Sequence, residues 1–174
     1  QGQDWKDYVV KFRLKLEKGS IHLNLRQTER GRFFVEVSPD GFGIHWQLGE
    51  RFSDNLPYTP FKYPLNEWHE YQYASQGDQI LLIVDGVVMV NYLDKRTIQT
   101  GSISFETLDG SSACVDDIVV NDLTGKPPYN VFYEQHFDNE KALGGWVMTD
   151  AGGKPNQAWQ IKDGALCGQG HKWI

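Results

Sequence analysis

The sequence of 174 residues has little cysteine, an excess of acidic over basic side chains, and no long apolar run. It contains 2 cysteines, and its 17 Lys and Arg residues against 23 Asp and Glu residues give a formal net charge of -6. A chain without a basic stripe cannot neutralise phosphates, so we expect no nucleic-acid partner. No apolar stretch approaches the roughly 20 residues of a membrane helix, and no signal peptide is present, so we expect no membrane insertion.

Several catalytic and metal-binding signatures are also missing. The histidines and cysteines have no zinc-type spacing, and we find no G-x-S-x-G elbow, phosphate-binding loop or dinucleotide fingerprint. The sequence leaves two alternatives open for Cys114 and Cys167, namely one disulfide in an oxidising compartment or two separate buried thiols.

What the sequence does contain is typical of a β-rich domain. Hydrophobic residues make up 40% of the chain and aromatic residues 13%, with 18 glycines and 7 prolines, and the length suits one domain. Residues 5–16 alternate between apolar and polar side chains, which predicts a half-buried strand. Residues 19–37 predict a β-hairpin with its turn at 29–31.

Further strands follow at regular spacing. An Asp-Gly pair at 85–86 predicts a tight hairpin between residues 79–84 and 87–92. Segment 38–64 reads as a long loop with one strand near 44–48. The other predicted strands are 67–74, 101–106, 113–120, 131–137, 158–161, 165–166 and 170–174. Short strands without helical periodicity predict an all-β fold, an antiparallel β-sandwich, in which we expect Trp146 and Trp159 to be core residues.

The segments WKDYVVKFRLKL, GSIHLNLR, GRFFVEV, WHEYQY, LLIVDGVVMV, GSISFETLD and VDDIVV resemble the concanavalin A-like lectin/glucanase superfamily. Within it they are similar to laminin-G-like jelly rolls, in particular the 3-keto-disaccharide hydrolase-type domain and fructan-binding carbohydrate modules. The resemblance implies a concanavalin A-like jelly roll and a ligand-binding sheet face. It implies that this face is lined by His22, Asn24, Arg26, Arg32, Glu106, His171 and Trp173.

The order of these segments is circularly permuted relative to the family. Segments that resemble FDNEKALGGW and AWQIKDGALCGQGHKWI come first in the family and last here. We therefore divide the chain into the main body of the jelly roll (1–120), a linker (121–130) and strands that complete a jelly roll (131–174). These last strands would complete the chain's own jelly roll, the next tandem repeat, or a neighbouring subunit by strand donation, which would build a head-to-tail polymer. The expected assembly residues are Gly170, His171, Lys172, Trp173, Ile174, Trp5 and Tyr8.

The carboxylates favour binding over catalysis. Glycoside hydrolysis needs two carboxylates across a cleft, and the E-x-D-x-x-E strand of the superfamily's glucanases is absent. Asp116 and Asp117 are adjacent, so they point to opposite faces of a strand and cannot share a substrate. Asp117 could instead hold a structural calcium ion together with Asp138 and backbone carbonyls.

These observations predict a non-catalytic, extracellular or cell-surface module of carbohydrate-binding type, whose partners are a glycan or polysaccharide and copies of itself. The first alternative is a purely structural filament or surface-layer subunit. The second is a glycoside-cleaving enzyme of the 3-keto-disaccharide hydrolase type.

Overall fold

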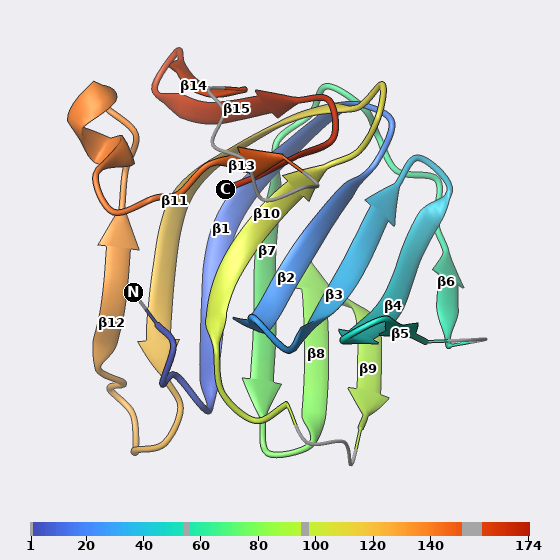
Figure 1. Ribbon diagram of the computed structural model, residues 1–174, viewed down its shortest axis with the longest axis vertical. Helices are drawn as coiled ribbons and strands as arrows, with labels where there is room; N and C mark the ends of the chain where they lie inside the picture. The colour runs from blue at the N-terminus through green and yellow to red at the C-terminus, as the bar shows by residue number, and fades with distance from the viewer. Residues whose placement is uncertain (1, 54–55, 95–97, 151–157) are drawn as a thin grey trace.

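The chain forms two antiparallel β-sheets that pack face to face, in a computed structural model that describes residues 2–53, 56–94, 98–150 and 158–174 (Figure 1). The elements in chain order are β1 (Tyr8–Lys18), β2 (Ile21–Thr28), β3 (Gly31–Ser38), β4 (Gly41–Leu48), β5 (Arg51–Phe52), β6 (Tyr58–Pro60), β7 (His69–Gln76), β8 (Gln79–Val84), β9 (Val87–Leu93), β10 (Ser102–Thr107), β11 (Ser112–Asp122), β12 (Val131–Gln135), the 3-10 helix η1 (Glu140–Leu143), β13 (Thr149–Asp150), β14 (Trp159–Lys162), β15 (Ala165–Gln169) and β16 (Lys172–Trp173). The predicted all-β sandwich is confirmed.

The chain alternates between the two sheets. The first sheet has the order β14-β15-β11-β1-β7-β8-β9, with β12 also paired to β11. The second sheet has the order β13-β16-β10-β2-β3-β4-β5, with β6 paired to β4. In Figure 1, β10, β2, β3 and β4 of the second sheet lie in front of β1, β7, β8 and β9 of the first.

The core lies between the sheets and is built from the alternating residues that the sequence indicates. Each of these residues is at most 4% exposed, because successive side chains of a strand point to opposite faces. They are Tyr8, Val10, Phe12, Leu14 and Leu16 of β1, Ile21, Leu23 and Leu25 of β2, and Phe33, Val35 and Val37 of β3. Of the two predicted core tryptophans, Trp159 is buried and Trp146 is partly buried against the core.

Segment 38–64 is more regular than predicted. Strand β4 runs over eight residues and pairs with β3 along its whole length, from Gly41 opposite Ser38 to Leu48 opposite Gly31. Strands β5 and β6 both pair with β4. The predicted strand near 44–48 is confirmed as part of β4, which begins earlier, at Gly41. The long-loop prediction is wrong for the start of β4 and for β5 and β6, because glycine and aromatic residues hide the alternation of β4.

The strands after residue 158 pair with the chain's own body. Strand β15 pairs with β11, and β16 pairs with β10. In the β14–β15 hairpin, the Trp159 ring packs on Gly168, where an added Cβ atom would lie 2.4 Å from ring carbons, so a glycine is required.

Cys114 and Cys167 face each other across β11 and β15 and form a disulfide. The sequence left this pairing open, and the register of the two strands decides it. The disulfide ties the C-terminal hairpin to the long central strand β11.

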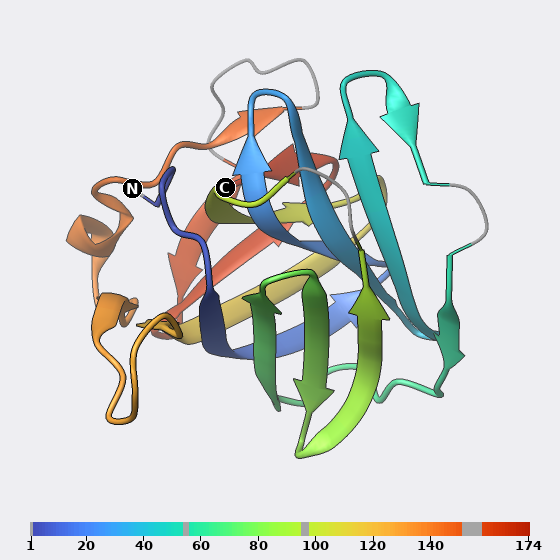
Figure 2. The ribbon, with the colours of Figure 1, turned by 90° about the horizontal axis from the view of Figure 1, so that it is seen from below.

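Both ends of the described chain lie beside β10. Gly101 N–H donates to Trp5 O (3.0 Å), and Phe105 and Ile174 exchange two backbone hydrogen bonds (2.9 Å each). The two termini therefore lie near each other, as Figure 2 shows. Within the described residues, no helix is long and apolar enough to cross a membrane.

Candidate functional site

The outer face of the second sheet gathers polar side chains from adjacent strands. Strand register places Glu106 of β10 opposite His22 of β2 on one side and opposite Trp173 of β16 on the other. Asn24 stands opposite Ser104 on the neighbouring strand. Since the alternate residues of β2 and β10 fill the core, these polar residues share the outer face.

Glu106 is the centre of this face. It is only 2% exposed, and its carboxylate is contacted by Arg32 Nη1 (2.6 Å), His22 Nδ1 (2.8 Å) and His171 Nε2 (3.0 Å). An ionised carboxylate only accepts hydrogen bonds, so the ring nitrogens that face it carry the hydrogen. Three donors from three different strands or loops therefore converge on one buried carboxylate.

Arg32 contacts two aromatic rings. Its Cζ atom is 4.4 Å from the ring centroid of Phe34 and 4.1 Å from that of Trp173, so it forms a cation–π contact with each ring. Arg32 Nη1 also donates to Asn24 Oδ1 (2.7 Å), and Nε donates to Gln47 Oε1 (3.1 Å). Nη2 of Arg32 and Nε2 of His22 take no part in these bonds.

The electrostatics keep Glu106 ionised. Burial raises the pKa of the carboxyl group, but the hydrogen bond from His22 and the positive charge of Arg32 outweigh burial and hold the pKa below its usual value. Burial lowers the pKa of the Arg32 guanidinium, and the charge of Glu106 offsets part of this effect. A carboxyl group with a lowered pKa is a poor general acid at neutral pH.

The structure brings together six of the seven predicted ligand-binding residues, and these six are defined here as the polar cluster. They are His22, Asn24, Arg32, Glu106, His171 and Trp173. Sequence reasoning missed Phe34 and Gln47, which flank Arg32. A signal for Phe34 was available, because it is an aromatic residue on the polar face of its strand.

Arg26 does not join the polar cluster, and the expectation that it shares the face of His22 and Asn24 is wrong. The register of β2 shifts between Leu25 and Thr28, and Arg26 has a positive φ of 49°, so the alternation breaks at this bulge. The guanidinium is buried and donates instead to three carbonyl oxygens of the surrounding loops. These belong to Lys6, Gly77 and Ile98.

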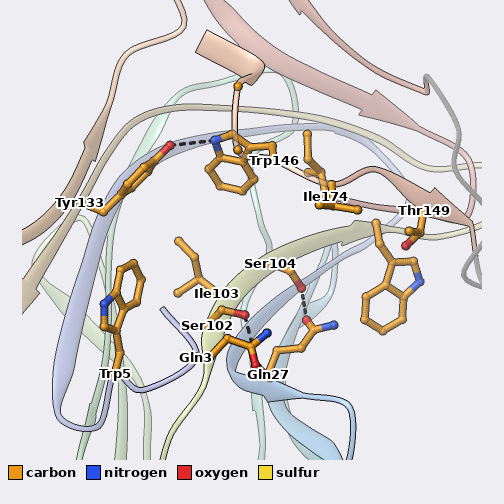
Figure 3. Close-up of a pocket in the computed structure, with 14 residues that line it drawn as sticks. Gln3, Trp5, Gln27, Ser102, Ile103, Ser104, Tyr133, Trp146, Thr149 and Ile174 are labelled. Carbon is orange, nitrogen blue, oxygen red and sulfur yellow. Dashed lines mark hydrogen bonds between the residues drawn. The ribbon is translucent and has the colours of Figure 1, made fainter. Parts of the chain in front are cut away.

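A cavity of about 340 Å³ lies at the edge of β10 (Figure 3), and it borders the polar cluster because Trp173 lines it. Trp173 and Ser104 belong to its wall, and Trp5 and Trp146 line it from other segments. Trp173 therefore contacts both Arg32 and the cavity. Within the described residues the lining contains no charged side chain; besides those named, it consists of Gln3, Gln27, Ser102, Ile103, Tyr133, Gly144, Gly145, Val147, Thr149 and Ile174.

The predicted calcium ligands Asp117 and Asp138 are not gathered into a metal site in the described structure. Asp117 forms an ion pair with Arg13 (2.7 Å from Nε) and a hydrogen bond with His136 Nδ1 (2.7 Å). Among the described residues, no group of three or more His, Cys, Asp or Glu side chains could hold a metal ion, so Asp117 and Asp138 do not belong to such a group. Calcium binding stays a prediction.

The predicted assembly residues make contacts within the chain. Tyr8 is fully buried, and its hydroxyl donates to Gly101 O (3.1 Å) and accepts from Arg26 N–H (2.8 Å). Lys172 and Trp173 form β16 on β10, and Gly170 precedes them. Trp5 and Ile174 both bond to the β10 segment of the same chain. These residues thus hold the chain's own jelly roll together.

Comparisons with known proteins define the class of fold. No protein family matches the chain, and no curated protein matches it in sequence. Among solved structures, the carbohydrate binding module CBM66 from Bacillus subtilis has a TM-score of 0.58 at 12% identity, over 66% of this chain and 74% of that one. The galectin LEC-6 from Caenorhabditis elegans has a TM-score of 0.51 at 13% identity, over 60% of this chain and 76% of that one. At these identities the likeness concerns the fold, which is a concanavalin A-like jelly-roll sandwich.

Proposed function

We propose that the chain is a non-catalytic carbohydrate-binding module of an extracellular protein. The observation that carries this proposal is the stack of Trp173 on Arg32 above the buried Glu106. Sugar recognition uses planar polar groups beside an aromatic surface, and the fixed fork of an arginine suits two neighbouring hydroxyl groups. Here Glu106, Asn24 and Gln47 hold the guanidinium in place, which leaves Arg32 Nη2 as a donor for a ligand. Because His22 Nδ1 carries the hydrogen toward Glu106, His22 Nε2 is an acceptor for a ligand.

Two further features support a neutral glycan as the ligand. The positive charge of Arg32 is balanced by Glu106 at 2.6 Å, so this pair adds no net charge to the face. Among the described residues, the side chains that line the adjoining cavity are uncharged and combine tryptophan rings with amide and hydroxyl groups. The fold is also shared with a protein named a carbohydrate binding module and with a galectin.

The state of Glu106 favours binding over glycoside cleavage. A hydrolase needs one carboxyl group kept protonated at working pH. Glu106 has a lowered pKa, and its carboxylate accepts hydrogen bonds from three side chains. It is therefore ionised and held in place, and it has no proton to give to a leaving group. We therefore assign Glu106 a positioning role for Arg32, His22 and His171.

The disulfide supports the extracellular part of the proposal. Cys114 and Cys167 are bonded, and structural disulfides persist in oxidising compartments outside the cytosol. Repetition in tandem, or exchange of the C-terminal strands between copies, is a second candidate function. This candidate is favoured by the backbone bonds of Ile174 to Phe105 and of Trp5 to Gly101, which lie along one edge of the second sheet. Backbone pairing at a sheet edge has the same geometry whether the two strands belong to one chain or to two.

A glycan array tests the proposal. We expect the purified chain to retain one class of neutral glycan, and Trp173→Ala to reduce that binding at least tenfold with an unchanged circular dichroism spectrum. Trp68→Ala is the matched control, since Trp68 is an exposed tryptophan that covers Arg13 (5.2 Å) and Lys15 (5.5 Å) of β1. The absence of any retained glycan, or equal loss in the two variants, would contradict the assignment.

A further inference from the structure

One row of paired residues crosses six strands on the outer face of the second sheet. Each member stands directly opposite the next, through the pairings of β16 with β10, β10 with β2, β2 with β3, β3 with β4 and β4 with β6. Its first three members belong to the polar cluster, so the row continues the proposed glycan site across β3 and β4 to β6. In order across the sheet, the row is Trp173, Glu106, His22, Glu36, Gly43 and Tyr58.

Aromatic side chains stand at the two ends of this row. Trp173 covers Arg32 at one end, and Tyr58 is 51% exposed at the other. Neighbouring strands lie about 4.8 Å apart, so the five steps from β16 to β6 separate the two ends by about 24 Å. Figure 1 shows β10, β2, β3 and β4 side by side, with β6 beyond β4. The distance exceeds the width of a single sugar ring several times.

Two glycines of β4 make room for the ring of Tyr58 on the sheet. A Cβ atom added at Gly41 would lie 2.8 Å from Tyr58 Oη and 2.9 Å from Cζ, and one at Gly43 would lie 3.6 Å from Cδ2. The ring therefore lies over backbone on one side, while half of its surface remains open to solvent. A tyrosine held in this way offers apolar ring area and a hydroxyl group to the same ligand.

Hydrogen-bonding groups stand beside Tyr58. His45 Nε2 would lie 2.9 Å from a Cβ atom at Gly43, so the imidazole borders the same glycine as the tyrosine ring. Glu36 is paired with Gly43, and its Oε2 atom is 4.0 Å from His45 Nε2. This distance is too long for a direct hydrogen bond. A ligand hydroxyl group between the two atoms could accept from Nε2 and donate to the carboxylate.

The surroundings of His45 favour such a bridge. The hydroxyl oxygen of Ser53 accepts from Trp46 N–H (3.3 Å) and lies 3.3 Å from His45 Nδ1, to which it can donate its own hydrogen. In that tautomer the imidazole hydrogen is on Nε2, on the side of the Glu36 carboxylate, which favours it electrostatically. Burial lowers the pKa of His45, so the ring is neutral at pH 7 and presents one donor.

Phe34 joins these groups to the polar cluster. Its ring stacks on that of His45 with centroids 5.0 Å apart, and its centroid is 4.4 Å from that of His22. The same ring carries the cation–π contact to Arg32. Phe34 is only 5% exposed, so it supports the face rather than contacting a ligand. One packed ring therefore fixes the side chains of β2, β3 and β4 relative to each other.

The charges along the row favour a neutral ligand. Glu106 and Glu36 carry two negative charges, and Arg32 carries one positive charge beside them. An acidic glycan would meet a net negative charge, whereas the hydroxyl groups of a neutral glycan can bond to carboxylate, imidazole and guanidinium alike.

We propose that this row binds a neutral linear oligosaccharide of several units, which extends from Trp173 to Tyr58. The unit at the far end lies on the Tyr58 ring, and one of its hydroxyl groups bridges His45 and Glu36. This inference rests on the proposed function and names the ligand class of that site, a chain that crosses the sheet instead of a single sugar held at the polar cluster.

Neutral glucans of two lengths test this ligand class, by titration of the full ¹⁵N-labelled chain followed by NMR. The probes are maltose and maltohexaose, cellobiose and cellohexaose, and laminaribiose and laminarihexaose. For one of these pairs, we expect both lengths to shift the indole N–H signal of Trp173, and only the hexasaccharide to shift the backbone amide signal of Tyr58. We also expect the hexasaccharide to bind at least tenfold more tightly than the disaccharide.

Two substitutions at the far end separate the two lengths. We expect Tyr58→Ala to lower hexasaccharide affinity at least tenfold, to the level of the disaccharide, and to leave disaccharide affinity unchanged. Tyr129→Ala is the matched control, since Tyr129 is 39% exposed and lies between β11 and β12 of the first sheet, and it should change neither affinity. His45→Phe keeps a planar ring but removes the donor, so we expect the same selective loss even if Tyr58→Ala does not fold.

The outcomes distinguish this inference from the proposed function. Equal affinity for the two lengths, or an equal effect of Tyr58→Ala on both, would overturn the extended ligand and leave the polar cluster as a site for a single sugar. The absence of any shift at Trp173 with all six probes would overturn both proposals.

Discussion

The indole of Trp173 covers the guanidinium of Arg32, with Arg32 Cζ 4.1 Å from the ring centroid. The two residues are far apart in the sequence, and they come from β16 and β3, which the sheet separates by β10 and β2. Their contact joins the C-terminal strand β16 to β3 on the outer face of the second sheet. Because Glu106 also binds Arg32 at 2.6 Å, the carboxylate fixes the guanidinium that Trp173 covers.

Replacement of Glu106 tests that control. We expect Glu106→Gln to lower the free energy of unfolding by about 3 kcal/mol, because it leaves the buried Arg32 without a counter-ion. Urea denaturation followed by tryptophan fluorescence measures the change. Glu36→Gln is the control, since Glu36 lies on the same face but is 38% exposed in its side chain, and we expect a change within about 0.5 kcal/mol. Similar losses in the two variants would show that Glu106 is no more than a surface charge.

The ion pair between Glu106 and Arg32 predicts that the stability of the fold depends on pH. The folded-state pKa of Glu106 is lowered from 4.5, so the folded state binds this proton less readily than the unfolded state. The stabilisation by Glu106 is therefore complete above pH 4.5 and is lost as the pH falls through the lowered pKa. We expect the difference in unfolding free energy between the native chain and Glu106→Gln to shrink between pH 7 and pH 3. A constant difference over that range would contradict the assigned charge state.

The disulfide gives a test of how the C-terminal strands are arranged. Since Cys114 and Cys167 pair within one chain, we expect a single monomer band on a non-reducing gel. Exchange of these strands between copies would instead produce a ladder of linked chains that collapses on reduction.

The disulfide also contributes to stability. Its cysteines are 53 residues apart, and we expect the variant Cys114→Ala with Cys167→Ala to lose about 4 kcal/mol of unfolding free energy. Thermal and urea denaturation measure the loss. Addition of a reductant should destabilise the native chain to the same extent and leave the double variant unchanged.

Arg26 should behave as a structural residue. We expect Arg26→Ala to lower the unfolding free energy by about 3 kcal/mol, because the carbonyl oxygens of Lys6, Gly77 and Ile98 lose the buried guanidinium as their donor. Arg30→Ala, in the exposed turn that follows, should change it by less than about 0.5 kcal/mol. At temperatures where Arg26→Ala remains folded, glycan affinity should equal that of the native chain. A selective loss of affinity would place Arg26 in the binding site after all.

Much of the fold followed from alternation alone. The core positions of β1, β2 and β3 were predictable because each strand buries one face, so that apolar residues recur with a period of two. The tight turn at Asp85-Gly86 was predictable from local backbone preference. Six residues of the polar cluster followed from the resemblance to a family in which one sheet face binds ligands.

The sequence by itself determined which residues could be buried and which faces could be polar, because that information is local to each strand. Only the tertiary structure decided which strands became neighbours. The bulge at Arg26 removed that residue from the polar face, and the register of β15 brought Cys114 to Cys167. Such outcomes depend on the register between distant segments, which packing of the whole sandwich selects and no single segment encodes.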